Sequence, residues 1–136
     1  MLIKVIRFKF QLNFYNKYKE QSMSETIFDK IISREISSDI VYEDDNYLAF
    51  RDINPQAPIH VLIIPKKRIS TINDLDENDA YIVGEMIIIA KNIAKDYSID
   101  QDGYRLVFNC NDYGGQTVYH IHLHLIGGRK LTWPPG

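Results

Sequence analysis

Residues 119–126 of the chain read Tyr-His-Ile-His-Leu-His-Leu-Ile and contain three of its four histidines. Side chains alternate between the two faces of a β-strand, so this stretch predicts a strand over 118–126 with three imidazoles on one face. Ile121, Leu123 and Leu125 would form an apolar opposite face. Each buried imidazole needs hydrogen-bond partners for its ring nitrogens. Three rings in one row therefore indicate more than packing.

Spacing leaves three interpretations of the histidine row open. The first is a set of hydrogen-bonded structural histidines. The second is a metal site, because neutral imidazole is a common zinc ligand. The other candidate ligands are scattered, however, and the single cysteine, Cys110, lies ten residues before His120. The third is nucleophilic catalysis, in which one ring attacks a substrate while its neighbours fix its tautomer and carry protons.

The loop that precedes the row favours an anionic ligand. Residues 114–117 read Gly-Gly-Gln-Thr. Glycines allow backbone N–H groups to approach an anion closely, and the hydroxyl of Thr117 adds a donor. Taken alone, a Gly-Gly pair more often marks a tight turn. Beside an imidazole row, a phosphate-binding loop favours phosphoryl or nucleotidyl transfer.

The rest of the chain predicts short alternating elements. Thr26 and Asp29 resemble a capping box for a short helix. Asp76 and Asp79 could cap a longer one, whose predicted apolar repeat is Ala80, Val83, Ile87, Ala90, Ile93, Ala94 and Tyr97. Strand patterns and turn residues complete the assignment. The predicted order is a helix at 26–33, strands at 40–43, 47–51 and 59–64, a helix to about 97, and strands at 104–109 and 118–126.

Length and composition indicate one intracellular domain. The 136 residues suit a single domain, and 45% hydrophobic residues suffice for its core. The net charge of −2 gives no general reason to bind nucleic acid or an acidic membrane. One cysteine excludes a disulfide-rich scaffold and favours a reducing compartment. No stretch is long and apolar enough to span a membrane.

Residues 1–22 differ in composition from the rest. They hold five basic residues against Glu20 alone, a net charge of +4, which leaves −6 for residues 23–136. Apolar and polar residues alternate over 5–12, which predicts a strand. We expect an accessory basic and aromatic extension over 1–23, with Met23 as a possible working start. A targeting or membrane-surface arm is the alternative.

The motifs together resemble a known family. Residues 120–129, His-Ile-His-Leu-His-Leu-Ile-Gly-Gly-Arg, are similar to the His-x-His-x-His-x-x motif of the histidine triad (HIT) superfamily. Residues 53–70, the Gly-Gly-Gln-Thr-Val-Tyr lead and the terminal Trp-Pro-Pro-Gly resemble its Hint branch. The resemblance covers 26–136 and predicts a HIT domain over 24–136. It implies an α+β fold with a five-stranded, mostly antiparallel sheet and two helices, the sheet being continued across a homodimer.

The resemblance also implies an activity and its nucleophile. Members of this branch are purine nucleoside phosphoramidases, which hydrolyse the P–N bond of AMP-amine conjugates such as adenosine 5′-phosphoramidate or lysine-linked AMP. The position of the family nucleophile is His122, which would form a nucleotidyl-histidine intermediate and release the nucleoside monophosphate. No cofactor or metal is implied, and the expected location is the cytoplasm, with the nucleus as a second compartment.

The remaining site residues are expectations of the same kind. His122 needs one ring nitrogen protonated, so we expect a carbonyl near His120 to accept that proton's hydrogen bond. His124 would hold a phosphate oxygen or protonate the leaving amine, and His60 would support the triad. Asp52 would bind the ribose hydroxyls, and Trp133 would reach the partner subunit's site. The purine would lie among Ile27, Phe28, Phe50, Ile53 and Leu62, and the phosphate beside Asn109, Gly115, Gln116 and Thr117. Thr117 stands where the branch usually has serine.

The sequence leaves three other functions open. A dinucleoside polyphosphate hydrolase would share the triad but lack the Trp-Pro-Pro-Gly tail. A nucleotide-binding scaffold with incidental turnover would keep the pocket without needing fast chemistry. A metal-binding module would use the same imidazoles as ligands.

Overall fold

Five antiparallel strands form one sheet in the order β1-β2-β3-β5-β4. The computed structural model describes residues 2–136. Its elements are α1 (Leu2–Met23), α2 (Ile27–Ile32), β1 (Ile40–Glu43), β2 (Tyr47–Arg51), β3 (Ile59–Pro65), 3-10 turns at Ile72–Asp74 and Glu77–Asp79, α3 (Ala80–Asp96), β4 (Tyr104–Phe108) and β5 (Leu123–Gly127). The predicted order of helix, three strands, helix and two strands from residue 24 onward is confirmed, and so is the α+β class.

The central strand is β3, and its sequence is a nearly continuous apolar run. It pairs with β2 on one side and with β5 on the other, and six of its seven residues are buried. The β1–β2 hairpin closes at Asp44, whose carboxylate oxygen accepts hydrogen bonds from the backbone N–H of Asn46 and Tyr47 at 2.8 and 2.7 Å. Register places His60 opposite Ile126 and Leu62 opposite His124. Two histidine-bearing strands are therefore neighbours.

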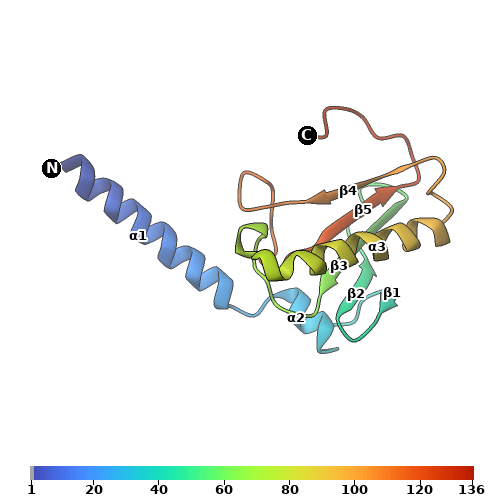
Figure 1. Cartoon of the computed structure of the whole chain (residues 1–136), viewed down its shortest axis with the longest axis horizontal. Coiled ribbons are helices and arrows are strands. Elements are labelled where there is room, and N and C mark those ends of the chain that lie inside the picture. Colours follow the sequence, from blue (N-terminus) through green and yellow to red (C-terminus); the bar gives the residue numbers. More distant parts are fainter. Residues whose placement is uncertain (1) are drawn as a thin grey trace.

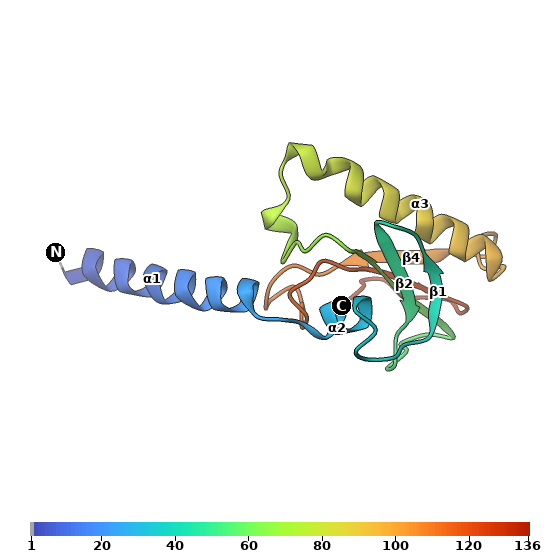
Figure 2. The same cartoon turned by 90° about the horizontal axis from the view of Figure 1, so that it is seen from below.

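The two faces of the sheet carry different helices. Helix α3 packs over the larger core, which includes Ile121, Leu123 and Leu125. The short helix α2 covers the opposite face through a second cluster that contains Phe28 and Ile31. Figure 2 shows α3 and α2 on opposite sides of the strands. Because the histidines alternate with the residues of the larger core, they face the α2 side.

Helix α2 begins as predicted. The Thr26 side chain accepts a hydrogen bond from the Asp29 backbone N–H at 3.3 Å, and the Asp29 carboxylate accepts one from the Thr26 backbone N–H at 2.7 Å. Such a reciprocal box satisfies two of the free donors of a first helical turn. Phe28 and Ile31 are thereby directed into the core beneath the helix.

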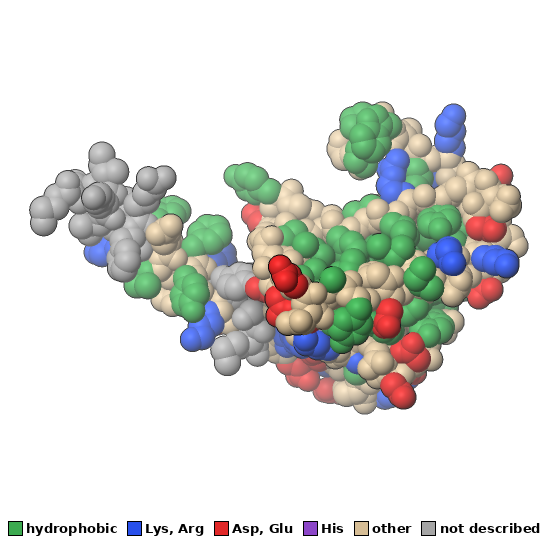
Figure 3. Space-filling view, in the orientation of Figure 1, with side chains coloured by type: hydrophobic (Ala, Val, Ile, Leu, Met, Phe, Trp, Pro, Cys, Tyr) green, Lys and Arg blue, Asp and Glu red, His purple; other side chains and the backbone are tan. Residues whose placement is uncertain are grey.

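The predicted apolar face of α3 is partly wrong. Ala90, Ile93 and Ala94 are buried as predicted, whereas Ile87 is 41% exposed. The first turns instead bury Ile82, Met86 and Ile89. Isoleucine occupies three consecutive positions from 87 to 89, so the sequence offers more than one apolar stripe, and contact with the sheet selects one. Several hydrophobic side chains therefore remain exposed on the outer face that carries α3. Figure 3 views this face.

The strand predicted for 118–126 is shorter in the structure. Strand β5 starts at Leu123, because residues 118–122 do not pair within the sheet. The backbone N–H of Ile121 instead donates to the carbonyl of Ile69 at 2.8 Å. Alternation nevertheless persists, since Ile121 lies in the larger core while His120 and His122 contact Phe28 of α2.

The strand predicted within residues 1–22 is wrong. Residues 2–23 form the helix α1, which adds a third helix to the two predicted for the domain, and residue 1 lies outside the described residues. An extended strand needs a neighbouring strand for its backbone hydrogen bonds, whereas a helix satisfies them internally. In the part of the chain that the structure describes, α1 pairs with neither sheet edge and projects from the domain in Figures 1 and 2. Phe10 and Phe14 on it are more than 70% exposed.

Candidate active site

The site lies where β3, β5 and the first turn of α2 meet. Residues before and within β5 carry the three predicted histidines, and β3 carries His60. Their rings form a contact series. The centroids of His60 and His124 are 5.2 Å apart, and those of His124 and His122 are 4.9 Å apart. The tertiary structure thus brings all four histidines of the sequence together.

The ring of His122 has a defined tautomer. Its Nδ1 lies 2.7 Å from the backbone carbonyl oxygen of His120. A carbonyl oxygen can only accept, so Nδ1 carries the hydrogen and Nε2 keeps a lone pair. The expected carbonyl is therefore confirmed. Burial lowers the pKa of His122, although the His120 carbonyl and Asp52 oppose that effect. The ring is a neutral imidazole with one nitrogen available to attack.

His60 and His124 form a directed pair of imidazoles. The backbone N–H of Gln56 donates to Nδ1 of His60 at 3.1 Å, so the hydrogen of neutral His60 resides on Nε2. This Nε2–H donates to Nδ1 of His124 at 2.9 Å. The hydrogen of His124 is consequently on Nε2, a buried atom without a hydrogen-bond partner within the described residues. Burial, His122 and His60 lower the pKa of His124 to about 4.

The ring of His120 is held away from solvent. It is fully buried, and its Nε2–H donates to the carbonyl oxygen of Pro65 at 2.6 Å. Phe28 presents its ring edge-on to both His120 and His122, at centroid distances of 6.0 and 5.0 Å. The side chain of His120 thus serves as support, while its carbonyl directs His122.

Asp52 lies beside this histidine series, and the residues predicted to hold the purine differ in their burial. A carboxylate oxygen of Asp52 lies 3.5 Å from Nε2 of His60, and the other accepts the Asn54 backbone N–H at 2.8 Å. Phe28, Phe50 and Leu62 are buried in one cluster under α2. By contrast, Ile53 is 94% exposed, and Ile27 is about half exposed. The buried residues can form the floor of an apolar slot, and the exposed ones its rim.

Internal hydrogen bonds stabilise the loop of residues 109–117, called the glycine loop here. The Asn109 side chain donates to the Gly114 carbonyl at 2.6 Å. Gln116 is buried, and its amide donates to the Ser70 carbonyl at 2.7 Å while its oxygen accepts the Asn111 backbone N–H at 2.9 Å. The Gln116 side chain therefore holds the loop together. Gly115 has φ of 79°, and Thr117 is exposed beside it.

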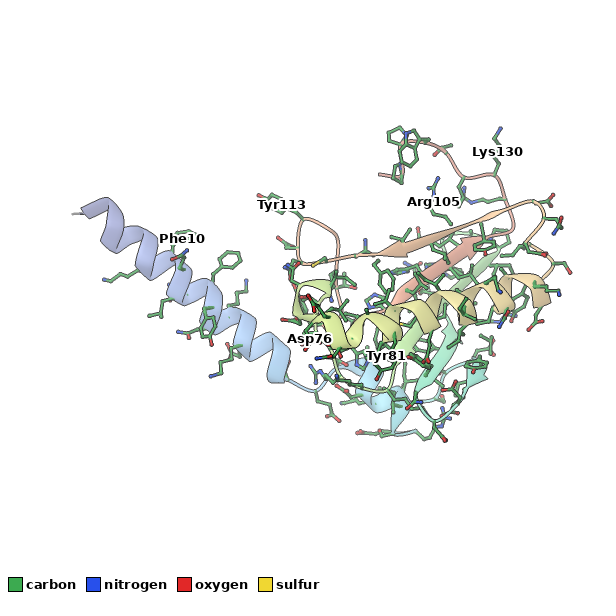
Figure 4. The ribbon with its side chains drawn as sticks, viewed as in Figure 1. Phe10, Asp76, Tyr81, Arg105, Tyr113 and Lys130 are labelled. Atoms are coloured by element: carbon green, nitrogen blue, oxygen red, sulfur yellow. The ribbon has the colours of Figure 1, made fainter. Side chains whose placement is uncertain are left out.

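The C-terminal tail lies over the other end of β4. Arg105 donates to the Thr132 carbonyl at 2.7 Å, and Figure 4 shows Arg105 on β4 and Lys130 on the tail itself. Trp133 is 83% exposed, so its ring is directed to solvent rather than into the core.

The arrangement can also be tested as a metal centre. One ligand atom from each of Asp52, His60 and His124 falls within 4.8 Å of the others. A metal ligand must offer a lone pair. Nε2 of His60 carries a hydrogen instead, because Nδ1 accepts the Gln56 N–H. These hydrogen bonds favour a proton relay over a metal centre.

Several participants carry no signal in the sequence. The backbone groups of Gln56, Pro65 and His120 orient the imidazoles, but any residue type presents such groups. Asp29 was identifiable as a helix cap, yet its approach to His120 depends on how α2 packs on the sheet.

The chain is similar to characterised proteins over this region. The family model described as "HIT domain" matches residues 33–131. A purine nucleoside phosphoramidase from Escherichia coli (strain K12) is 59% identical over 107 residues, which span 79% of this chain and 90% of that protein. A protein from Zea mays named as a 14 kDa zinc-binding protein is 53% identical over 115 residues, with 83% of this chain and 89% of that protein covered.

Solved structures agree. A HIT family hydrolase from Legionella pneumophila superimposes with a TM-score of 0.81 at 56% identity, covering 82% of this chain and 100% of that one. A histidine triad protein from Clostridium difficile gives a TM-score of 0.77 at 43% identity, covering 81% and 97%.

Proposed function

The chain belongs to the HIT domain family, and on that premise we propose that it is a purine nucleoside phosphoramidase that hydrolyses the P–N bond of AMP-amine conjugates. The observation that carries the proposal is the tautomer of His122. Its Nδ1–H is tethered to the His120 carbonyl, so the Nε2 lone pair is available for an attack on phosphorus.

The first chemical step forms a nucleotidyl-histidine. Nε2 of His122 attacks the α-phosphorus, a new N–P bond forms, and the bond from phosphorus to the amine breaks. The leaving nitrogen takes a proton from Nε2 of His124. We infer that the His60–His124 pair enters this step with one extra proton, which the negative phosphoryl group attracts. After the transfer, the pair is neutral again.

The second step reverses the proton movement. Water attacks phosphorus, the bond between phosphorus and Nε2 of His122 breaks, and the nucleoside monophosphate is released. The proton lost by the water returns to the His60–His124 pair, which restores the starting state. The hydrogen bond of 2.9 Å between these two rings supports a shared proton.

We propose the following substrate contacts. The purine lies against Phe28, Phe50 and Leu62, with Ile27 and Ile53 at its rim. Asp52 accepts hydrogen bonds from the ribose hydroxyls. Asn109, Gly115 and Thr117 bind the phosphate, and the internal hydrogen bonds of Gln116 support their loop.

The decisive experiment is rapid quench with a labelled AMP phosphoramidate. The wild type should accumulate an acid-labile nucleotide adduct on His122 and release AMP. His122→Ala should form no adduct. Its kcat should fall by roughly 10³-fold or more, which is typical for the loss of a nucleophile. His124→Asn is the matched control, because it should still form the adduct but more slowly. Equal turnover by wild type and His122→Ala would contradict the proposed catalysis and favour a nucleotide-binding scaffold.

We also propose a homodimer in which the sheet continues across two copies. Strand β4 is a sheet edge with every residue half-buried, so it can accept another strand. Helix α3 exposes Tyr81, Ile87 and Ile88 on the outer face. Trp133 is similarly exposed and would reach the partner's site. Sedimentation should give twice the chain mass, and Ile88→Glu should halve it, whereas Asn73→Glu should not.

Location and chain organisation are further proposals. Among the described residues, no helix has the length and apolarity needed to cross a bilayer. The single cysteine, Cys110, is half-buried and carries a free thiol, which suits a reducing cytoplasm. We propose that residues 24–136 form the catalytic domain and 1–23 an accessory extension.

A further inference from the structure

The Gly-Gly-Arg turn at residues 127–129, where β5 ends, packs closely against the segment that leads into β3. Gly128 has φ of 88°, and a Cβ placed on it would lie 3.0 Å from the Cβ of Pro58. The guanidinium of Arg129 donates to the backbone carbonyl of Gln56 at 2.9 Å. The turn is therefore attached to Gln56, and no step of the proposed reaction uses this attachment.

Gln56 connects the turn to the pair of imidazoles that supplies the proton. Its backbone N–H donates to Nδ1 of His60 at 3.1 Å, and Nε2 of His60 lies 2.9 Å from Nδ1 of His124. Arg129 is exposed, whereas His60 is 4% exposed. A continuous series of contacts thus runs from a surface cation through the Gln56 backbone to the ring of His124.

The position of Gln56 depends on individual hydrogen bonds, because it lies outside the strands. Residues 52–58 between β2 and β3 have no regular secondary structure. The Gln56 side chain donates to the Asn54 carbonyl at 3.0 Å, which is a contact within the same segment. The bond from Arg129 links the Gln56 carbonyl to a different part of the chain. A charged donor also makes a stronger hydrogen bond than a neutral one.

The N–H of Gln56 selects the direction of the hydrogen bond between the two rings. In the observed direction, His60 donates from Nε2, and His124 keeps its own hydrogen on Nε2. In the reverse direction, Nδ1 of His124 would donate, and Nε2 of His124 would hold only a lone pair. Nδ1 of His60 would then carry a hydrogen that faces the Gln56 N–H. Two facing donors repel, so the amide excludes the reverse direction.

The same N–H faces the position where the additional proton of the proposed reaction enters. The hydrogen between the rings and the hydrogen on Nε2 of His124 are already in place. The additional proton therefore binds Nδ1 of His60, against the Gln56 N–H. A hydrogen bond to the neutral form of a group disfavours its charged form. The amide consequently keeps the resting pair neutral and makes the protonated pair a stronger acid.

We propose that Arg129 is a positioning residue of the His60–His124 acid pair, which holds Gln56 in place and so keeps the Gln56 N–H on Nδ1 of His60. The inference rests on the proposed function, in which this pair protonates the leaving amine. Arg129 acts through the backbone of Gln56 rather than on the reacting atoms. Gly128 contributes the close approach that brings the guanidinium to that backbone.

Other groups that face the two rings stay unchanged when Arg129 is replaced. Burial is the largest influence and lowers the pKa of both His60 and His124. Asp52, at the end of β2, raises both pKa values, and its carboxylate lies 3.5 Å from Nε2 of His60. His122 lowers the pKa of His124. A change in the Arg129 variant therefore reports either the Gln56 N–H or the lost positive charge.

Three variants separate the hydrogen bond from the charge. Arg129→Gln removes both, and it should fold normally because the side chain is exposed. Gly128→Ala keeps the charge but displaces the turn, since alanine is strained at the positive φ and lacks space there. Arg105→Gln is the matched control. It removes a guanidinium that donates to the Thr132 carbonyl at 2.7 Å and leaves the bond to Gln56 intact.

The experiment is a pH titration of the imidazole ¹⁵N signals in the full chain and these variants. The midpoints of His60 and His124 should lie about 0.5 pH unit higher in Arg129→Gln and Gly128→Ala, because the neutral pair loses a donor. At pH 7.5 the Nε2 signal of His124 should move toward that of a nitrogen with a lone pair. Arg105→Gln should match the wild type in both respects.

A second readout is the pH profile of kcat/KM with an AMP-amine conjugate. The limb that belongs to the acid pair should move to higher pH in Arg129→Gln and Gly128→Ala, by the amount seen in the ¹⁵N titration, because this profile reports groups of the free enzyme. KM should change less than twofold, since no substrate contact is removed. The profile of Arg105→Gln should coincide with that of the wild type.

Unchanged ¹⁵N midpoints in Arg129→Gln would overturn the proposal, and so would an equal change in Arg105→Gln. A change in Arg129→Gln with none in Gly128→Ala would assign the effect to the lost charge and would also overturn it. If the wild type shows no turnover, the proposed function fails, whereas the ¹⁵N midpoints still decide whether Arg129 holds the Gln56 N–H on His60.

Discussion

At the scale of single residues, each imidazole is oriented by a different partner, and the partner determines which nitrogen holds the hydrogen. A carbonyl fixes His122, whereas a backbone N–H fixes His60 and, through it, His124. The result is a lone pair on His122 beside an N–H donor on the adjacent ring of His124. A hydrolase of P–N bonds needs those two functions side by side.

Thr117 leads to a prediction at this scale. The residue is exposed at the end of the glycine loop, and its extra methyl, compared with serine, restricts the side-chain rotamer. Thr117→Ser should keep the enzyme active but change kcat, or the ratio of rates for two leaving amines, by about threefold, because the hydroxyl gains rotamer freedom. Steady-state kinetics with two AMP-amine conjugates would measure this. Thr132→Ser in the exposed tail serves as control, and identical constants for Thr117→Ser and wild type would contradict the expectation.

At the scale of elements, the loop between β4 and β5 is shaped by close backbone approach rather than by secondary structure. Asn111 adopts a positive φ of 59°, and Gly115 one of 79°. A Cβ placed on Gly114 would lie 2.4 Å from the Cys110 carbonyl oxygen. The glycine loop therefore depends on glycine at 114 for space. Figure 4 shows Tyr113 at the exposed tip of this loop.

Gly114→Ala should consequently displace the loop. We expect kcat to fall at least tenfold and the protein to lose about 2 kcal/mol of unfolding free energy, because the backbone contact cannot yield cheaply. Urea unfolding and AMP-amine hydrolysis would measure both. Asp112→Ala changes an exposed side chain of the same loop and should stay within about 0.5 kcal/mol of the wild type. Normal activity in Gly114→Ala would show that the loop tolerates another path.

At the scale of the whole molecule, helix α1 does not pair with the sheet, although its Phe14 and Tyr15 line one cavity with Tyr113 and Tyr119. The matched family region begins at residue 33, and the described α1 projects from the sheet with exposed phenylalanines. The functional residues proposed above all lie after residue 26. We therefore expect the domain to fold without α1 as a packing partner.

Removal of residues 1–22 should leave kcat within twofold and the melting temperature within about 3 °C, since little buried surface is lost. Removal of residues 1–29 is the contrasting truncation. It deletes the Thr26 cap, Phe28 and Asp29, and should abolish turnover. Calorimetry and the hydrolysis assay would distinguish the two. A large loss in the shorter truncation would assign α1 a structural role.

The four clustered histidines predict that the folded state loses stability in acid. The pKa values of His60, His120, His122 and His124 are all lowered, chiefly by burial, and His124 reaches about 4. The unfolded chain therefore binds more protons below its histidine pKa of about 6.5. Stability is complete above that pH and falls as the pH drops toward about 4.

Urea midpoints at pH 7.5 and pH 5.0 would test this. We expect a loss of about 2 kcal/mol at the lower pH. His124→Gln should show a smaller loss, because one buried titrating ring is removed. The carboxylates with lowered pKa, including Asp29 and Asp79, act at still lower pH. Equal midpoints at both pH values would contradict the burial of neutral rings.

The amino-acid sequence alone determined the elements whose signals are local. Thr26 and Asp29 lie three residues apart, and the hairpin turn at Asp44 closes on its own side chain, so few residues specify each. The alternation of histidine with isoleucine and leucine also placed the imidazoles on one face, even where β5 had not yet begun.

Only the tertiary structure decided which groups meet across long separations. Sixty-four residues separate His60 from His124, and fifty-five separate the Pro65 carbonyl from His120. The buried face of α3 depended on its contact with the sheet. The helical state of residues 2–23 depended on the lack of a pairing strand for this segment among the described residues. Periodicity reports which side chains share a face, whereas burial and backbone hydrogen bonds between distant segments exist only once the chain has packed.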